Sequence, residues 1–494
     1  MVPQAHGEGG RIGQDVAASF RDPAGRLLAV DGRILRLVHR GGAGDLAAFL
    51  ASSAAQQLIV AGRVVATRTL DRGERAALRA DPRIGAAADD AAQILEHQPI
   101  PFPSYPYEWP AEMLLDAGRL TLDLAERLLA EGLGLKDATP YNVLFDGPRA
   151  RFVDVLSVER RDPLDATWLP YAQFVRTFVL PLLVNRHFHL PLRQVFEASR
   201  DGLEPEAVYR LCGPLQRLRP PFLTLASLPT WLAARHRSAE SQAATYRPKR
   251  ARSPEEARFV LRYQFRRLRR SLEAAAPRGG RVSPWSDYAT ADARRPELAA
   301  KTALVEQLMH DVRPHSVLDV GCNTGYLAML AARAGARVVA IDADPVVVGA
   351  AWRSAAADGW DVLPLVVDLT RPSPAIGWRN RECPAFLERA GAGGGFDAVW
   401  LFAVIHHMLV TERVPLTEII DLAADLTTPA GHAVIEFIPP DDPLFRRLTR
   451  GREALFADLT APAFEAAAKR RFVVLGSQPV PGTGRRLYLL RKTP

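Results

Sequence analysis

The feature that most constrains this chain is a strand, a glycine-rich turn and a helix in immediate succession. Residues 316–320 predict a buried strand, and residues 326–334 predict a helix closed by Gly335. Gly-Cys-Asn-Thr-Gly stands between them, at 321–325. Glycines at such a turn allow the backbone to bend and let a ligand approach the N–H groups of the helix N-terminus. The segment therefore predicts a ligand site at the carboxyl end of a strand in an α/β domain.

The rest of the C-terminal region continues this alternation. A parallel sheet covered by helices is the architecture that such a pattern favours. We predict further helices at 297–312 and 345–358, and seven strands at 316–320, 337–342, 362–368, 396–403, 432–438, 472–476 and 486–490. The last two strands are expected to form a closing pair.

Acidic residues end three of the predicted strands. Asp319 precedes the glycine turn, where a carboxylate suits the cationic amino end of a ligand better than a pyrophosphate. Asp342 ends the second strand and can accept both hydroxyls of a ribose. Asp368 ends the third and is placed to bind an adenine amine. The alternative is an ordinary α/β domain with a coincidental glycine turn, which three acidic strand ends in register disfavour.

The series D-V-G-C-N-T-G, V-V-A-I-D-A-D and L-V-V-D resembles that of class I S-adenosylmethionine-dependent methyltransferases. The resemblance covers residues 300–494 and implies a seven-stranded Rossmann-like sheet with S-adenosylmethionine as cofactor. It implies that Asp342 holds the ribose and Asp368 the adenine. The methionine portion would be held at the turn, where the cofactor-binding residues are Asp319, Gly321, Cys322, Asn323 and Gly325.

Four further short motifs narrow the resemblance to one group of methyltransferases. They are W-S-D-Y at 285–288, G-W-R-N at 377–380, I-H-H at 405–407 and E-F-I-P-P at 436–440. Together these are similar to the nodulation-type methyltransferases of bacteria. Trp285, Tyr288 and Lys301 are placed to close over the cofactor, with Lys301 meeting its carboxylate. The alternative is that the two aromatics only pack and that the lysine is solvated.

Two histidines are the candidate catalytic residues. Methyl transfer from a sulfonium is an in-line displacement, so a base is needed only when the acceptor arrives protonated. His406 and His407 follow the fourth strand, at the sheet edge where ligands bind, and either can serve. The alternative is that they cap or pack the next helix. Glu436 and Asp441 are second-rank candidates, and no cluster has metal-ligand spacing, so we expect no metal.

A second motif lies in the N-terminal half. Residues 135–144 resemble the catalytic loop of protein-kinase-like folds, in which an aspartate base stands five residues before a metal-binding asparagine, as Asp137 and Asn142 do here. Asp154 follows at the position of the second metal-binding residue. A long predicted helix, 111–131, precedes the loop. The resemblance implies an α+β kinase-like domain ahead of the methyltransferase-like sheet.

The upstream part of this half departs from the kinase pattern. An active kinase needs a lysine on an N-lobe strand, yet no lysine precedes Lys136. Arg68 stands at the expected position, and arginine substitutes poorly there. Three hypotheses remain: a kinase-like fold kept as a binding module, which we favour; a working phosphotransferase; or turn and cap residues in another fold.

A basic segment joins the two halves. Apolar residues at helical spacing within 254–272 predict an amphipathic helix with an arginine stripe. Such a helix can bind RNA or a membrane surface, but a connecting helix with one packed face is the favoured interpretation. The predicted domains are thus 1–245, kinase-like; 246–299, a basic linker; and 300–494, the methyltransferase domain.

Composition sets the remaining limits. The net charge of +8 reflects abundant arginine and favours no specific anion. Three widely spaced cysteines predict neither a disulfide framework nor a CxxC metal site. No apolar run spans a bilayer and residues 1–20 lack a signal sequence, so we expect a cytoplasmic protein without a membrane partner. The predicted function is methyl transfer to an O or N nucleophile of a small-molecule or glycan-type acceptor. The alternatives are an RNA methyltransferase, with nucleic acid not the favoured partner, or a bifunctional protein with an active phosphotransferase.

Overall fold

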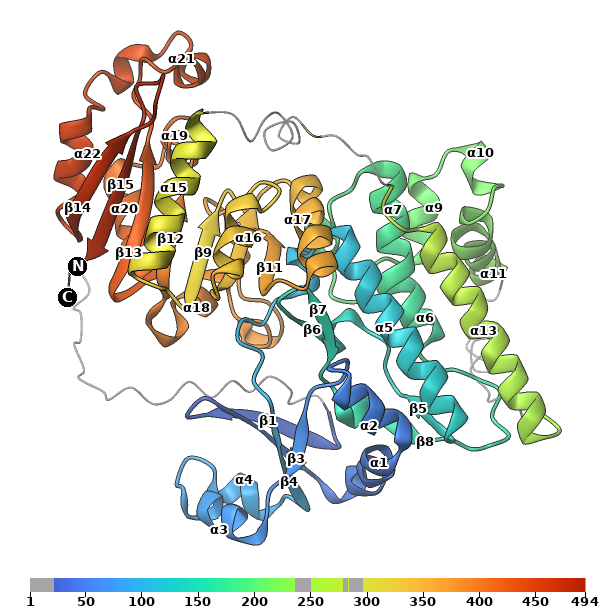
Figure 1. Ribbon diagram of the computed structural model, residues 1–494. Coiled ribbons are helices and arrows are strands. Elements are labelled where there is room, and N and C mark those ends of the chain that lie inside the picture. Colours follow the sequence, from blue (N-terminus) through green and yellow to red (C-terminus); the bar gives the residue numbers. More distant parts are fainter. Residues whose placement is uncertain (1–21, 236–249, 279–282, 284–295, 494) are drawn as a thin grey trace, which may run out of the picture.

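The computed structural model describes residues 22–235, 250–278, 283 and 296–493 (Figure 1). The N-terminal region, 22–278, combines a small sheet with a group of helices, and the C-terminal region, 296–493, is built on one large sheet. The motif at 285–288 and residues 1–20 lie outside the described residues. Within the described part, no helix is both long and apolar enough to cross a bilayer.

The N-terminal region begins with a four-stranded antiparallel sheet in the order β1-β2-β4-β3. Its strands are β1 Gly25–Val30, β2 Arg33–Val38, β3 Thr67–Thr69 and β4 Gln93–His97, and its helices are α1 Arg40–Ala51, α2 Ser53–Val60, α3 Arg72–Ala80 and α4 Gly85–Asp89. Two short strand pairs follow, β5 Leu133–Leu135 with β8 Val158–Arg160 and β6 Val143–Asp146 with β7 Arg149–Phe152. These pairs hold the loop that resembles a kinase catalytic loop.

Helix α5, Ala111–Ala130, is the centre of the helical part and confirms the helix predicted there. The other helices of this part are α6 Tyr171–Phe174, α7 Leu180–Phe188, α8 Leu192–Ala198, α9 Pro205–Leu211, α10 Pro214–Arg217, α11 Leu228–Arg235 and α13 Pro254–Ala274, of which α7 and α13 pack directly on α5. The 3₁₀ turns are η1 Pro106–Glu108, η2 Pro140–Asn142 and η3 Val155–Ser157, and the π-helical turns are η4 Val175–Val179 and η5 Leu223–Ser227.

The predicted amphipathic helix is α13, which packs on α5. All four predicted apolar positions, Leu261, Phe265, Leu268 and Leu272, are buried. Ion pairs between α5 and α13 flank this contact, at 2.6 Å between Arg269 and Asp123 and at 2.6 Å between Arg119 and Glu273. One face of the helix is therefore committed to the N-terminal region.

The C-terminal region contains the predicted seven-stranded sheet, in the order β11-β10-β9-β12-β13-β15-β14. The strands are β9 Ser316–Val320, β10 Arg337–Asp342, β11 Val362–Val366, β12 Phe396–Leu401, β13 Thr427–Phe437, β14 Phe472–Pro479 and β15 Arg486–Lys492. Strand β15 runs antiparallel to its neighbours β13 and β14, and the pairs among β9 to β13 are parallel. The fold class is mixed α/β, as predicted.

Helices cover both faces of this sheet. They are α15 Pro296–Asp311, α16 Tyr326–Arg333, α17 Pro345–Asp358, α18 Phe386–Gly391, α19 Ile405–Val410, α20 Leu416–Asp425, α21 Pro443–Thr449 and α22 Ala461–Ala468, with η6 Trp378–Asn380, η7 Ala392–Gly394 and η8 Glu453–Phe456. Neighbouring strand residues such as Val317 and Leu318 belong to different apolar clusters on opposite faces. Burial on both faces explains why the strands read as continuous apolar runs.

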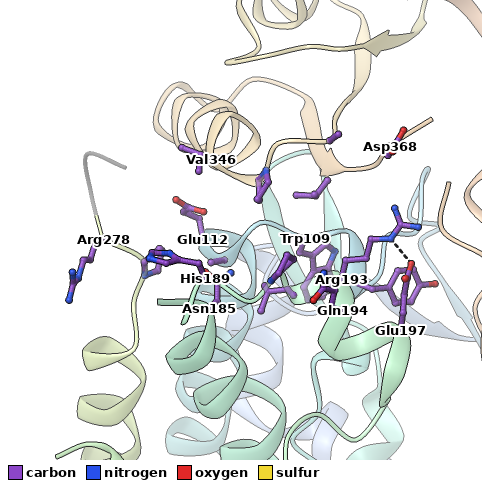
Figure 2. Close-up of a pocket in the computed structure, with 18 of the residues that line it drawn as sticks. Trp109, Glu112, Asn185, His189, Arg193, Gln194, Glu197, Arg278, Val346 and Asp368 are labelled. Atoms are coloured by element: carbon purple, nitrogen blue, oxygen red, sulfur yellow. Dashed lines mark hydrogen bonds and ion pairs between the residues drawn. The ribbon is translucent and has the colours of Figure 1, made fainter. Parts of the chain in front are cut away.

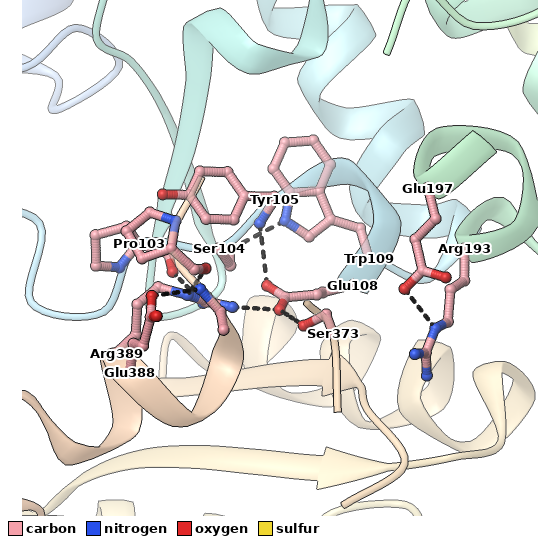
Figure 3. A network of polar contacts seen from close by, with 12 residues as sticks. Pro103, Ser104, Tyr105, Glu108, Trp109, Arg193, Glu197, Ser373, Glu388 and Arg389 are labelled. Carbon is pink, nitrogen blue, oxygen red and sulfur yellow. Dashed lines mark hydrogen bonds and ion pairs between the residues drawn. The ribbon is translucent and has the colours of Figure 1, made fainter. Parts of the chain in front are cut away.

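The two regions share one core and one buried ion pair. A single apolar cluster includes both Trp109 and Leu318, and α5 packs against α17. Figure 3 shows Glu108, just before α5, accepting hydrogen bonds from Arg389 and Ser373 of the C-terminal region. The Glu108 side chain is fully buried and that of Arg389 is 5% exposed. The shared core and this buried ion pair join the two regions, and removing one partner of the pair would leave the other buried without its counter-charge.

Candidate active site

A cavity of about 350 Å³ opens at the carboxyl ends of the central strands. The segments that follow β9, β10, β11 and β12 all contribute to its wall, as the strand order requires. Predicted cofactor residues on this wall are Gly321, Cys322, Asn323, Asp342 and Asp368. The structure therefore brings together segments that are separate in the sequence.

The glycine turn has the conformation that its sequence predicts. Gly321 has a φ of 73°, and a Cβ atom there would lie 2.4 Å from Cγ2 of Val404. Gly325 has a φ of 81° and begins helix α16 as its N-cap. Asn323 also adopts a positive φ, of 52°. Both glycines are needed for backbone geometry, and Gly321 also because a side chain would not fit.

Asp319 lies beneath the turn rather than on the cavity wall, and is 2% exposed. Its Oδ2 has no hydrogen-bond partner among the described residues. Burial, together with the nearby Asp342 carboxylate, raises the pKa of Asp319 to about 7. A buried carboxylate oxygen without a partner suits a cationic donor, because such a donor would offset the cost of its burial.

The other two acidic strand ends are anchored by backbone and side-chain donors. Asp342 accepts hydrogen bonds from the N–H of Asn323 at 3.0 Å and of Asp344 at 2.9 Å, and burial raises its pKa. Asp368 accepts from the N–H of Thr370 at 2.9 Å and from its hydroxyl. Each carboxylate oxygen can accept more than one hydrogen bond, so both side chains keep acceptor capacity for a ligand.

Cys322 is buried beside them on the cavity wall, and burial raises the pKa of its thiol well above the ordinary value. The thiol is therefore neutral at physiological pH and acts there as a small apolar group.

The two histidines occupy different positions. His407 lies on the cavity wall, where burial lowers its pKa and keeps the ring neutral at physiological pH. His406 is fully buried behind it, with ring centroids 4.1 Å apart. Burial lowers the pKa of His406 to about 3, and both its ring nitrogens lack hydrogen-bond partners in the described part of the chain. Of the two candidates, His407 is the one that faces the cavity.

A buried charge network next to the cavity was only partly predicted. Lys301 lies on the wall and forms an ion pair with Glu436 at 2.7 Å, with side chains 5% and 0% exposed. Arg485 reaches the same Glu436 at 3.5 Å and Asp442 at 2.8 Å. Glu436, a second-rank candidate base, is thus engaged by two cations, and Asp441 is exposed. Arg485 and Asp442 were missed because the contacts join distant segments.

The three residues of the kinase-like motif in the N-terminal region differ from one another in burial and in hydrogen-bond partners. Asp137 is exposed, and partial burial together with the Asp154 carboxylate raises its pKa. Asn142 is 8% exposed, and its Nδ2 has no partner among the described residues. Asp154 accepts a 2.9 Å hydrogen bond from Arg36 on β2, which is 5% exposed and also donates to the carbonyl of Val153.

Arg36, and not Arg68, is the arginine that meets this loop. Arg68 lies exposed on β3, where it pairs with Glu74 and Glu96. Arg36 was not identified from the sequence, although a charged residue within the apolar strand 33–38 indicates that its side chain pairs with a buried acidic group. Among the described residues, no group of three or more metal-ligating His, Cys, Asp or Glu side chains is found.

Comparison with known proteins identifies relatives of the C-terminal region and of the whole chain. Residues 260–469 match the family model of a methyltransferase domain. The chain is 30% identical over 482 residues to nodulation protein NoeA of Rhizobium meliloti (strain 1021), covering 97% of this chain and 96% of that protein.

Solved structures with partial likeness include the N-methyltransferase NodS of Bradyrhizobium japonicum WM9 in complex with S-adenosyl-L-homocysteine, at 16% identity, 43% and 93% coverage and a TM-score of 0.32. The bifunctional kinase-methyltransferase WbdD matches at 17% identity, 41% coverage of each chain and a TM-score of 0.29.

The C-terminal region is a S-adenosylmethionine-dependent methyltransferase domain, as its motif series predicted. Over nearly its whole length, the chain belongs to the family of the nodulation protein NoeA. The resemblance to nodulation-type methyltransferases is thereby confirmed.

Proposed function

We propose that this protein transfers the methyl group of S-adenosylmethionine to an oxygen or nitrogen nucleophile of a small-molecule or glycan-type acceptor. The observation that carries the proposal is one cavity lined by Asp342 and Asp368, with Asp319 buried directly before the glycine turn that forms part of its wall. One carboxylate oxygen of Asp319 has no partner among the described residues. This arrangement offers separate acceptors for a cationic amine, a ribose and an adenine.

The residues present fit the cofactor along its whole length. Asp319 would hold the ammonium group, Asp342 the ribose hydroxyls and Asp368 the adenine amine. Lys301 lies on the wall, where its ammonium can meet a carboxylate while remaining paired with Glu436. The cofactor supplies an electrophilic methyl group on a sulfonium centre.

His407 is the proposed proton acceptor. With the cofactor held there, an acceptor's lone pair would bond to the methyl carbon as the carbon–sulfur bond breaks, and the electron pair of that bond would stay on the sulfur of the S-adenosylhomocysteine released. A hydroxyl or ammonium acceptor must also lose a proton. Burial keeps His407 neutral at physiological pH, so its ring can take that proton. His406 would only support this ring by packing.

We propose that the N-terminal region is a binding module rather than a phosphotransferase. A nucleotide-bound metal ion needs the Asp154 carboxylate, and the positive charge of the Arg36 guanidinium, 2.9 Å from one of its oxygens, would repel such an ion. Arginine cannot give up its charge to make way for a metal ion. The module's contribution would be to help shape the acceptor site.

Calorimetric titration with S-adenosylhomocysteine tests the cofactor assignment. Asp342→Ala removes a carboxylate on the cavity wall, whereas Asp458→Asn changes an exposed aspartate of the same region and serves as control. Loss of charge-assisted hydrogen bonds costs about 1.5–3 kcal/mol, which is roughly ten- to a hundredfold in affinity. Equal affinities for parent and Asp342→Ala would contradict the assignment.

A further inference from the structure

A second cavity, of about 420 Å³, lies between the two regions (Figure 2). Its N-terminal side is formed by the start of α5, the end of α7 and helix α8, and its C-terminal side by α17 and the segments after β10 and β11. We call it the interdomain cleft. It adjoins the cofactor cavity, because Ala343 and Asp368 line both. The cleft exists only because the N-terminal region is docked on the methyltransferase domain.

The charges of the interdomain cleft are largely matched. Arg193 pairs with Glu197 at 2.7 Å, and Arg371 lies 3.5 Å from Asp368. Arg353 of α17 pairs with Glu112 of α5 across the two regions. A polyanion such as nucleic acid needs several cations without competing carboxylates, so it fits this lining poorly.

One lining cation differs from these. Arg278 is exposed and forms no ion pair among the described residues. It leaves room for a single anionic substituent on a ligand.

The remaining polar groups are amides over an apolar wall. Gln194 is exposed on α8, and its side-chain amide makes no hydrogen bond within the described part of the chain. Asn185 donates to the carbonyl of Leu190 at 2.9 Å, which leaves its own oxygen as an acceptor. Amides both donate and accept hydrogen bonds, carboxylates accept them and guanidinium groups donate them, so together they can match neighbouring hydroxyls. Pro191 and Val346, both partly exposed, add apolar surface of the kind that encloses ligands.

We propose that the interdomain cleft binds the part of a hydroxyl-rich, glycan-type acceptor that is remote from the methylated atom. The inference rests on the proposed function and adds where the acceptor is recognised. Binding energy from a remote part of a substrate can be used to orient its reacting atom. Arg193 is suited to this coupling, because it also donates at 2.8 Å to the carbonyl of Arg371, next to the cofactor cavity. A protein with only the methyltransferase domain would lack this recognition.

The test is calorimetric titration of the full-length protein with cellopentaose, maltopentaose and the pentamer of N-acetylglucosamine. We expect at least one of these to bind. Gln194→Ala and Glu197→Gln should each weaken that binding about tenfold, because each removes roughly one hydrogen bond between the protein and the oligosaccharide. The matched control is Gln98→Ala, because Gln98 is also an exposed glutamine but does not line the cleft. This variant should leave the oligosaccharide affinity unchanged.

S-adenosylhomocysteine titration of the same samples separates the two proposals. No oligosaccharide binding, or binding that Gln194→Ala and Glu197→Gln leave intact, overturns the inference about the cleft even when the cofactor product binds normally. Oligosaccharide binding that both cleft variants weaken supports the proposal that the cleft binds the acceptor. If that same protein does not bind S-adenosylhomocysteine, only the proposed function is contradicted.

Discussion

Two regions of this molecule carry acidic residues, those of the methyltransferase domain and those of an N-terminal segment that resembles a kinase loop, and their carboxylates have different partners. In the methyltransferase domain, Asp319 is buried beside a cavity and one of its oxygens lacks a partner among the described residues. In the N-terminal region, Asp154 stands where the kinase resemblance would place a metal-binding residue, but it accepts a hydrogen bond from the cationic Arg36. The difference teaches that a motif places an acid, while its partners decide whether that acid can take a ligand.

The largest expected effect comes from breaking the junction that holds the two regions together. Arg389→Met leaves the fully buried Glu108 without its cation, so the free energy of unfolding should fall by about 3–5 kcal/mol. Urea unfolding followed by circular dichroism measures this. Arg381→Met, an exposed arginine nearby in sequence, should change stability by less than about 0.5 kcal/mol. Similar stabilities for both variants would show that the regions do not depend on this ion pair.

A second prediction sharpens the contrast through pH. Without ligand, Asp319 has a pKa of about 7, and a bound ammonium group favours its ionised form. The affinity for S-adenosylhomocysteine should therefore fall as the pH drops from 8 to 6, roughly tenfold per pH unit below the pKa. Calorimetry across this range measures the slope, and Asp319→Asn should flatten it. A pH-independent affinity in the parent would contradict the role of Asp319.

A third prediction concerns Lys301. Lys301→Met removes the cation proposed to meet the cofactor's carboxylate and leaves Glu436 with Arg485 alone. We expect a loss of about 1.5–3 kcal/mol in S-adenosylhomocysteine binding. Thermal unfolding of the free protein separates lost binding from lost stability. An unchanged affinity in a stable variant would restrict Lys301 to a structural role.

The smallest expected effect is in the N-terminal loop. Asp137→Asn alters an exposed side chain that lies outside the lining of the cofactor cavity, so methyl transfer and S-adenosylhomocysteine affinity should change less than about twofold. A phosphotransferase would instead lose its nucleotide-dependent activity with this residue. Measuring ATP turnover beside methyl transfer checks both. Turnover in the parent that disappears in Asp137→Asn would contradict the binding-module proposal.

The sequence predicted local features better than long-range ones. The glycine turn, the positions of the seven strands along the chain and the buried face of α13 could be predicted from the sequence. They follow from the periodicity of apolar residues and from the freedom of glycine at positive φ. The strand pattern also gave the positions of the three acidic strand ends, and the family resemblance supported the roles expected of them. That Asp319 lies beneath the wall and Asp342 upon it depends on side-chain direction, which only the folded sheet sets.

Contacts between distant segments could not be predicted. Arg36 and Asp154 are 118 residues apart, and Arg389 and Glu108 are 281 apart, so no local pattern links either pair. The sequence left the two histidines equivalent, because adjacent residues at the start of a helix have no intrinsic preference for the cavity. Packing decided that His407 faces it and His406 does not.

The most direct test of the comparison between the two regions is one pair of calorimetric titrations on the parent protein, first with S-adenosylhomocysteine and then with ATP and Mg²⁺. The structure predicts saturable S-adenosylhomocysteine binding and no binding of magnesium ATP, because the C-terminal carboxylates keep acceptor capacity and Asp154 is held by Arg36. The opposite result, magnesium ATP binding by a folded protein that ignores S-adenosylhomocysteine, would contradict the account at its centre.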